Sequence, residues 1–248
     1  MDKKMKKKWF ENWFDSMYYH LLYQNRNDEE ANLFIENLIK FLNPKKKSLF
    51  LDVACGTGRH SIKLNKKGFR VEGFDLSKKS LKKAKIHEKE NLTFYIKDMR
   101  KLKVKNKYDI ILNLFTSFGY FDNDKDNFLV SENMYNALKR KGYIIIDFFN
   151  TEKIIKQKKS KETKKIKNIL FEIEKSHDSK FIYKKIKIID KNKQYTFNEK
   201  VRLINKEKFV NYYKDFNVNL KAVFGDYSLN TYDPKVSDRL ILIFQKIN

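Results

Sequence analysis

The segment at residues 51–60, which reads LDVACGTGRH, constrains the fold of this chain more than any other part of its sequence. A short apolar run at residues 48–54 leads into a Gly-Thr-Gly turn, and a helical stretch begins at Arg59. Glycines let a backbone approach a ligand closely, and the first turn of a helix presents unpaired N–H groups to an anion. The segment therefore predicts a buried strand, a tight ligand-binding turn and a helix in direct succession.

Strands and helices alternate through the first 150 residues. A helix capped by Asp28 carries apolar residues at i, i+3 and i+4 spacing and ends before Pro44. Further helices are expected at residues 59–66, after the capping residue Ser77, and at residues 126–140. The expected strands are residues 48–54, 69–75, 92–97, 108–114 and 143–149. Such alternation predicts an α/β fold, in which a mostly parallel sheet is covered by helices on both faces.

The pattern changes after residue 149. Three strands without intervening helices are expected at residues 169–175, 181–189 and 194–203, with hairpin turns between them. They predict an antiparallel β meander inserted into the α/β fold, after which a helix capped by Asn205 and two strands complete the sheet. We therefore expect a helical cap at residues 1–43, a cofactor-binding core at 44–150, an inserted antiparallel lid at 151–204 and a completing segment at 205–248.

Acidic residues follow two further strands. Asp75 ends the strand after the glycine turn, 17 residues beyond Gly58, where a carboxylate is placed to accept hydrogen bonds from ribose hydroxyls. Asp98 follows the third strand, with Met99 beside it. A dinucleotide site needs G-x-G-x-x-G, but Ser61 stands at the third position, so a nicotinamide oxidoreductase is disfavoured.

The run LDVACGTG, followed by Asp75 and Asp98 at later strand ends, resembles the class I S-adenosylmethionine-dependent methyltransferases, whose first motif runs (V/L)-L-D-x-(A/G)-x-G-x-G. The resemblance implies a Rossmann-like seven-stranded sheet with an antiparallel last strand. It also implies that Gly56 and Gly58 contact the amino-acid part of S-adenosylmethionine, Asp75 the ribose, and Asp98 with Met99 the adenine edge. The residues expected to bind this cofactor, or its product S-adenosylhomocysteine, are Asp52, Ala54, Gly56, Thr57, Gly58, Asp75, Leu76, Asp98, Met99, Asn113, Tyr19 and Arg26.

A narrower resemblance extends over nearly the whole chain. The segment NLFTSFGYF at residues 113–121 is similar to the post-strand segment of bacterial small-molecule methyltransferases, including the aminosugar N-methyltransferase type. The segments YYHLLYQNR at residues 18–26, DFFN at 147–150 and FGDY at 224–227 also fit that group, whereas residues 151–193 depart from it. The expected substrate-binding residues are Tyr18, Tyr23, Phe118, Asn150 and Arg202.

The chemistry of a sulfonium methyl donor sets what the site must do. Transfer to a neutral amine or hydroxyl disperses charge, so the main requirement is in-line positioning in a dry pocket. Aromatic faces suit a sulfonium or ammonium, and the candidates are Tyr18, Tyr19, Tyr23, Phe118 and Tyr120. A general base is needed only if the acceptor arrives protonated, and Tyr120, Asp147 and Glu199 are the candidates. No ligand spacing of the HExxH or CxxC type accompanies His60, so we expect no metal.

The net charge of +24 suggests a nucleic acid or another anionic partner. However, 48 of the 55 basic residues are Lys and only 7 are Arg, the residue that base readout and bidentate phosphate recognition favour. A Lys-rich, Arg-poor composition also arises from an AT-rich coding sequence. The eight Lys of residues 151–167 are typical of a solvated helix or mobile loop, and a docking surface for a polyanion is the alternative.

These observations together predict a cytoplasmic methyltransferase that acts on a small-molecule amine or hydroxyl, as a monomer or homodimer. The lone Cys55 fits a reducing compartment, and no apolar run reaches the roughly 18 residues of a membrane span. We find no signal peptide. The N-terminal aromatic residues Trp9, Phe10, Trp13 and Phe14 predict a helix packed onto the domain, with membrane docking as the alternative.

Two other functions stay open. The first is an RNA or protein methyltransferase that docks its substrate on the Lys-rich insertion. The motif (D/N)-P-P-(Y/F) of N6-adenine enzymes does not follow the fourth strand, where Asn-Leu-Phe-Thr stands instead. The second is a non-catalytic module that binds the cofactor without turnover.

Overall fold

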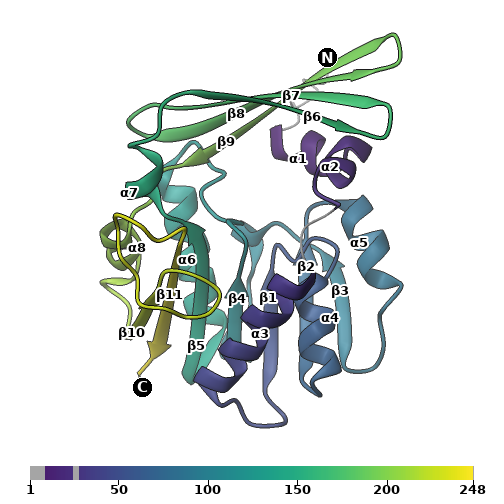
Figure 1. Ribbon diagram of the computed structural model, residues 1–248. Helices are drawn as coiled ribbons and strands as arrows, with labels where there is room; N and C mark the ends of the chain where they lie inside the picture. Colours follow the sequence, from purple (N-terminus) through teal and green to yellow (C-terminus); the bar gives the residue numbers. More distant parts are fainter. Residues whose placement is uncertain (1–8, 25–27, 248) are drawn as a thin grey trace, which may run out of the picture. The chain divides into compact units, whose positions relative to one another are not determined.

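A computed structural model describes residues 9–24 and 28–247 of the chain (Figure 1). The predicted cofactor residue Arg26 lies outside the described residues. Contacts divide the chain into two compact units: residues 27–156 with 204–248, and residues 1–26 with 157–203. We call them the sheet unit and the insert unit.

The sheet unit is built on a seven-stranded sheet with the strand order β10-β11-β5-β4-β1-β2-β3. Strands β1 to β5 run parallel to one another, whereas β11 lies between β5 and β10 and is antiparallel to both. This confirms the predicted α/β class and the antiparallel last strand. The strands are β1 (Leu49–Val53), β2 (Arg70–Asp75), β3 (Leu92–Ile96), β4 (Tyr108–Asn113), β5 (Leu138–Phe149), β10 (Val218–Phe224) and β11 (Arg239–Lys246).

Helices cover both faces of this sheet (Figure 1). The helices of the sheet unit are α3 (Asp28–Leu42), α4 (Arg59–Lys66), α5 (Lys78–Lys85), α6 (Asp124–Ala137), the short α7 (Thr151–Ile154), which follows β5, and α8 (Lys206–Tyr213), with a 3-10 turn at Met99–Lys101. Helices α3, α4 and α5 bury apolar residues in one cluster with Phe50, Ile110 and Leu112 of the sheet. Every residue of β1 is buried, as expected of a central parallel strand.

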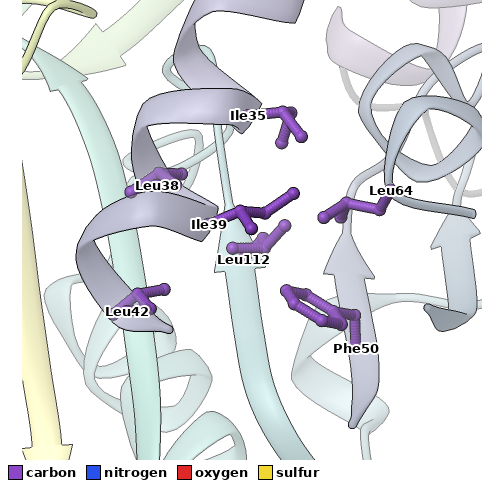
Figure 2. Close-up of a pocket in the computed structure, with 7 residues that line it drawn as sticks. All are labelled: Ile35, Leu38, Ile39, Leu42, Phe50, Leu64 and Leu112. Atoms are coloured by element: carbon purple, nitrogen blue, oxygen red, sulfur yellow. The ribbon is translucent and has the colours of Figure 1, made fainter. Parts of the chain in front are cut away.

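A small space under α3 shows how complete this packing is. Figure 2 shows its lining, which is apolar throughout: Ile35, Leu38, Ile39, Leu42, Phe50, Leu64 and Leu112. A volume of about 10 Å³ holds one water at most, and a water needs polar partners. The space is therefore a packing defect of the core and not a ligand site.

The insert unit contains a four-stranded antiparallel sheet with the order β6-β7-β8-β9. Its elements are α1 (Trp9–Phe14), α2 (Met17–Leu22), β6 (Ser160–Ile166), β7 (Ile169–His177), β8 (Phe181–Asp190) and β9 (Lys193–Arg202). Trp13 is fully buried and its ring lies 4.8 Å from that of Phe197 on β9, while Tyr18 packs against Tyr195. The N-terminal aromatic residues thus pack onto this sheet, as predicted.

Two local predictions were wrong. Residues 160–166 of the Lys-rich segment form the edge strand β6, not a helix or loop, because β7 supplies their hydrogen-bond partners. Lysines on an edge strand also oppose pairing with another chain. Strand β5 begins at Leu138, where a helix was expected, because α6 ends at Ala137 and Leu138 pairs with Tyr108.

Two features are absent from the part of the chain that the structure describes. None of its helices is both long enough and apolar enough to cross a membrane. The same residues contain no group of three or more His, Cys, Asp or Glu side chains placed to hold a metal ion.

Candidate functional site

The glycine turn between β1 and α4 has an open side and a packed side. Ala54, Gly56 and Gly58 all have left-handed backbone, with φ of 59°, 58° and 78°. A Cβ atom added to Gly56 would meet nothing within 4 Å, whereas one at Gly58 would lie 2.7 Å from the Phe94 ring. Gly58 caps α4 without a side-chain hydrogen bond, and the Ser61 N–H in the first turn of that helix donates to Asp52.

Asp75, the last residue of β2, fixes the backbone of this turn. One carboxylate oxygen accepts a hydrogen bond from the Gly56 N–H and the other from the Ser77 N–H, both at 2.8 Å. Ser77 in turn caps α5 through its hydroxyl. Asp75 therefore links the glycine turn to the start of the next helix, at the sheet edge where open α/β folds bind ligands.

Asp52 lies beneath the turn and is almost fully buried. Its carboxylate accepts a hydrogen bond of 2.5 Å from the Ser61 hydroxyl on α4. Burial, opposed by that bond, raises the pKa of Asp52 to about 7. Ser61, which breaks the dinucleotide fingerprint, thus ties α4 to β1.

Replacing Asp52 by asparagine should stabilise the chain, relative to wild type, increasingly as the pH rises from about 4 to about 7. The folded-state pKa of about 7 lies above the roughly 3.9 of an unfolded chain, so the folded state keeps a proton that the unfolded state has released. Wild-type stability therefore falls as the pH rises towards 7 and levels off above it, whereas asparagine does not titrate. Urea unfolding of both proteins should show the difference growing by about 1.4 kcal/mol per pH unit. Asp215→Asn, at an exposed carboxylate, is the control, and a difference independent of pH would contradict the assignment.

Asn113 ends β4 and joins three parts of the same edge. Its amide nitrogen donates to the Val53 carbonyl at 3.3 Å and to the Ser117 carbonyl at 3.1 Å. Its Oδ1 is buried and finds no donor among the described residues. An unpartnered buried acceptor is costly, so this atom suits a ligand that brings a donor, such as the ammonium of S-adenosylmethionine. Two structural features therefore fit this cofactor: the unpartnered Oδ1 of Asn113 and the open side of the turn at Gly56.

The predicted adenine-edge residues lie after β3. Asp98 caps the 3-10 turn through the Arg100 N–H at 2.9 Å and pairs with the Arg100 guanidinium at 2.5 Å. Met99 is buried, and its carbonyl accepts a hydrogen bond from Asn133. Thr57 and Leu76 are half-buried. Their contacts with a cofactor stay predictions.

Several predicted residues belong to the insert unit, where they share hydrogen bonds. The Tyr18 hydroxyl donates to Asp190 at 2.9 Å. Glu199 accepts from the Tyr23 hydroxyl at 3.0 Å and pairs with Lys184 at 3.3 Å. The Tyr19 ring lies 5.0 Å from that of Tyr23, and the Arg202 guanidinium lies 4.7 Å from the Phe181 ring. The unit thus brings Tyr19, Tyr23 and Glu199 together, and their roles stay predictions.

The remaining predicted residues lie in the sheet unit. Phe118 is buried against Phe209 and Tyr212. Asn150 caps α7, donates to the Pro234 and Ser237 carbonyls and accepts from Tyr232, so its amide organises the segment before β11. Tyr120 donates to the Thr116 carbonyl at 2.7 Å. Substrate contact by Phe118 or Asn150 stays a prediction.

Asp147, a candidate base, is held by residues that the sequence patterns did not bring together with it. Its Oδ1 accepts from the Arg239 Nε at 2.8 Å, and its Oδ2 accepts from the Phe115 N–H at 2.7 Å and the Tyr227 hydroxyl at 3.1 Å. Arg239 stands 92 residues away in sequence and Tyr227 80 away. No local signal reports such a distant pairing.

A family model described as "Methyltransferase domain" matches residues 44–208. Among curated proteins, a putative methyltransferase YqeM of Bacillus subtilis is 32% identical over 112 residues, which cover 44% of this chain and 45% of that protein. A glycine/sarcosine N-methyltransferase of Halorhodospira halochloris is 32% identical over 138 residues, which cover 54% of this chain and 50% of that protein. The chain spans about half the length of the curated relatives it matches.

Solved structures match over nearly the whole chain. An S-adenosylmethionine-dependent methyltransferase from Clostridium acetobutylicum is 20% identical, with a TM-score of 0.79, and the match covers 96% of this chain and 99% of that one. An amino pentose methyltransferase, CalS10, from Micromonospora echinaspora is 16% identical, with a TM-score of 0.72, and covers 93% of this chain and 97% of that one. At these identities the likeness shows a shared fold.

Proposed function

Because this chain belongs to the class I S-adenosylmethionine-dependent methyltransferases, we propose that it transfers the methyl group to a small-molecule amine or hydroxyl. The known relatives of the chain support an acceptor of this class. They include glycine/sarcosine N-methyltransferases and an N,N-dimethyltransferase for an amino sugar. The acceptors in those names are properties of those proteins, and only their general class is proposed for this one.

The observation that carries the proposal is the extent of the structural likeness. It spans 93% of this chain with the amino pentose enzyme and also 93% with a sugar N-methyltransferase, KedS8. A match of that length takes in the insert unit as well as the sheet unit. The family model covers residues 44–208, which include residues 157–203 of the insert unit but not its N-terminal segment.

Ion pairs in the insert unit neutralise part of its positive charge. Each of the four glutamates in its strands pairs with at least one lysine of the same sheet. The pairs are Glu162 with Lys164 and Lys175, Glu172 with Lys187, Glu174 with Lys161, and Glu199 with Lys184. These pairs occupy five lysines, but residues 157–203 still hold 15 basic against 6 acidic residues, so the unit keeps a positive charge that the labelling experiment below must test as a docking surface.

The chain's own residues would hold the cofactor at the edge of the sheet. Gly56 and the N-terminus of α4 would receive its amino-acid part, Asn113 Oδ1 would accept from its ammonium, and Asp75 would bind its ribose. S-adenosylmethionine, when bound, supplies an electrophilic methyl group on a sulfonium. A neutral amine needs no base before attack, so positioning and exclusion of water are the main tasks of the protein. Tyr120 and Glu199 stay the candidates for proton transfer from a protonated acceptor.

Transfer of labelled methyl into fractions of a cell lysate tests the proposal. Purified protein is incubated with labelled S-adenosylmethionine and separately with the RNA, protein and small-metabolite fractions, together with glycine and sarcosine as defined acceptors. We expect label in the metabolite fraction, and none with Asp75→Ala. Label in RNA or protein would overturn the acceptor class, and cofactor binding without any transfer would favour a non-catalytic module.

A further inference from the structure

The turn that follows β4 is strained. Phe115 and Thr116 both have left-handed backbone, with φ of 58° and 62°. For a residue other than glycine this conformation is disfavoured by about tenfold or more. Two such residues in succession persist only where the surrounding structure holds them, and such strain concentrates at functional sites.

Four hydrogen bonds hold these two residues. The Phe115 N–H donates to Asp147 Oδ2 at 2.7 Å, and the Thr116 N–H donates to the Asp147 carbonyl at 2.9 Å. Arg239 donates to the Thr116 hydroxyl at 3.1 Å, and Tyr120 donates to the Thr116 carbonyl at 2.7 Å. Three of the four therefore come from Asp147 and its ion-pair partner.

The Asp147–Arg239 pair is itself fixed by burial. Its shortest separation is 2.7 Å, and the two side chains are 1% and 18% exposed. The Tyr227 hydroxyl donates to the same carboxylate, and burial beside Asp147 raises the pKa of Tyr227. A buried pair with this geometry has one arrangement, so it can impose one arrangement on the turn.

The turn also contacts the cofactor-binding edge. The centre of the Phe115 ring lies 5.2 Å from the Arg59 guanidinium and 5.7 Å from the Arg239 guanidinium. Arg59 is the first residue of α4, directly after Gly58. On the other side, Asn113 joins the end of β1 to the Ser117 carbonyl. A change in the turn would therefore be transmitted to both Asn113 and the start of α4.

We propose that Asp147 and Arg239 are positioning residues for methyl transfer. They hold the left-handed turn at Phe115 and Thr116, and through it Asn113 and residues 117–121, in the arrangement that transfer requires. This role requires neither residue to touch the cofactor or the acceptor. The inference rests on methyltransferase activity alone, so it stands whether the acceptor proves to be a small molecule, an RNA or a protein.

The test replaces Arg239 by lysine, alone and together with Thr116→Gly. Lysine keeps the charge but cannot bridge Asp147 and Thr116 with a planar fork. We expect Arg239→Lys to lower the rate of labelled methyl transfer about tenfold at saturating S-adenosylmethionine, with whichever lysate fraction accepts label from the wild type. The dissociation constant for S-adenosylhomocysteine, measured by calorimetry, should rise by a smaller factor than the rate falls, because Asn113 keeps its second hydrogen bond, to the Val53 carbonyl. Arg70→Lys, at an exposed site on β2, is the matched control.

Glycine at position 116 should restore the rate, because glycine adopts positive φ without steric cost. We expect the double variant to come within about threefold of Thr116→Gly alone. Hydrogen exchange gives a readout that does not depend on an acceptor: the amides of Phe115 and Thr116 should exchange at least about tenfold faster in Arg239→Lys. A role in global stability alone would raise exchange throughout the sheet and would not be restored by glycine.

A second pair of variants leaves the buried ion pair untouched. Thr116→Val removes the hydroxyl that Arg239 contacts and keeps the shape, whereas Thr116→Ser keeps the hydroxyl. We expect Thr116→Val to lose rate several-fold and Thr116→Ser to retain it, so the proposal stays testable if Arg239→Lys does not fold. Equal rates for these two variants would overturn it. So would a tenfold loss of S-adenosylhomocysteine affinity in Arg239→Lys, or failure of glycine to restore the rate.

Discussion

Replacing Asp75 by alanine should weaken the binding of S-adenosylmethionine by about a hundredfold or more. Asp75 accepts hydrogen bonds from the Gly56 and Ser77 N–H groups, and each bond to a charged group contributes about 1.5–3 kcal/mol. Without the carboxylate the glycine turn loses the contact that fixes its open side, and the proposed ribose contact is lost as well. A hundredfold change corresponds to about 2.7 kcal/mol, within reach of one such bond and well within two. Calorimetric titration with S-adenosylhomocysteine measures the change.

A conservative pair of variants separates this effect from a general loss of structure. Asp75→Asn keeps the shape and should lose about tenfold in affinity, because it removes the charge. Asp109→Asn is matched to it, since Asp109 also accepts a backbone N–H of a neighbouring strand, that of Leu49 at 2.8 Å. Asp109 lies at the opposite end of the sheet, where β4 begins, so its variant should bind within about twofold of wild type. Equal losses in both variants would show that Asp75 acts through the fold and not through the cofactor site.

The sheet unit could be predicted from sequence because its signals are local. The apolar run before Gly56, the helix at residues 59–66 and the cap at Ser77 each depend on residues within one or two turns of chain. The same holds for the site, where the glycine turn and Asp75 lie at successive strand ends as expected. Because parallel strands place their carboxyl ends along one edge of the sheet, residues predicted separately at strand ends could be expected to lie close together.

The two wrong predictions, for β6 and for the start of β5, concern segments whose conformation is set by pairing with other strands. Strand β6 has no apolar periodicity, and its strand conformation comes from pairing with β7, which a local pattern does not contain. Strand β5 begins at Leu138 because that residue pairs with Tyr108 on β4, a partner that the local pattern around Leu138 does not contain. The Asp147–Arg239 pair joins two strands that are neighbours only in the folded sheet. One sequence reports what a segment prefers, but not which distant segment will satisfy it.

Two alanine substitutions in the glycine turn should have different effects: Gly58→Ala should lower the stability of the fold, and Gly56→Ala should weaken cofactor binding. At Gly58 the new Cβ would lie 2.7 Å from the Phe94 ring and 3.2 Å from the Ala84 side chain, at a φ of 78°. Overpacking of this kind costs about 1–3 kcal/mol and the left-handed backbone about 1–2 kcal/mol more. Gly58→Ala should therefore lower the free energy of unfolding by about 3 kcal/mol, measured by urea denaturation.

Gly56→Ala should lower the free energy of unfolding less than Gly58→Ala does, and should weaken cofactor binding instead. Its Cβ meets no protein atom within 4 Å, so only the backbone cost of about 1–2 kcal/mol at a φ of 58° applies. The added methyl group would occupy the side of the turn that the proposal assigns to the amino-acid part of S-adenosylmethionine. We expect affinity for S-adenosylhomocysteine to fall more than about tenfold. If Gly56→Ala binds like wild type, the open side of the turn faces solvent and the cofactor lies elsewhere along the edge of the sheet.

If Gly58→Ala is as stable as wild type, the Phe94 ring moves to make room for the new methyl group. Strand β3 then does not hold the glycine turn as rigidly as its packing implies.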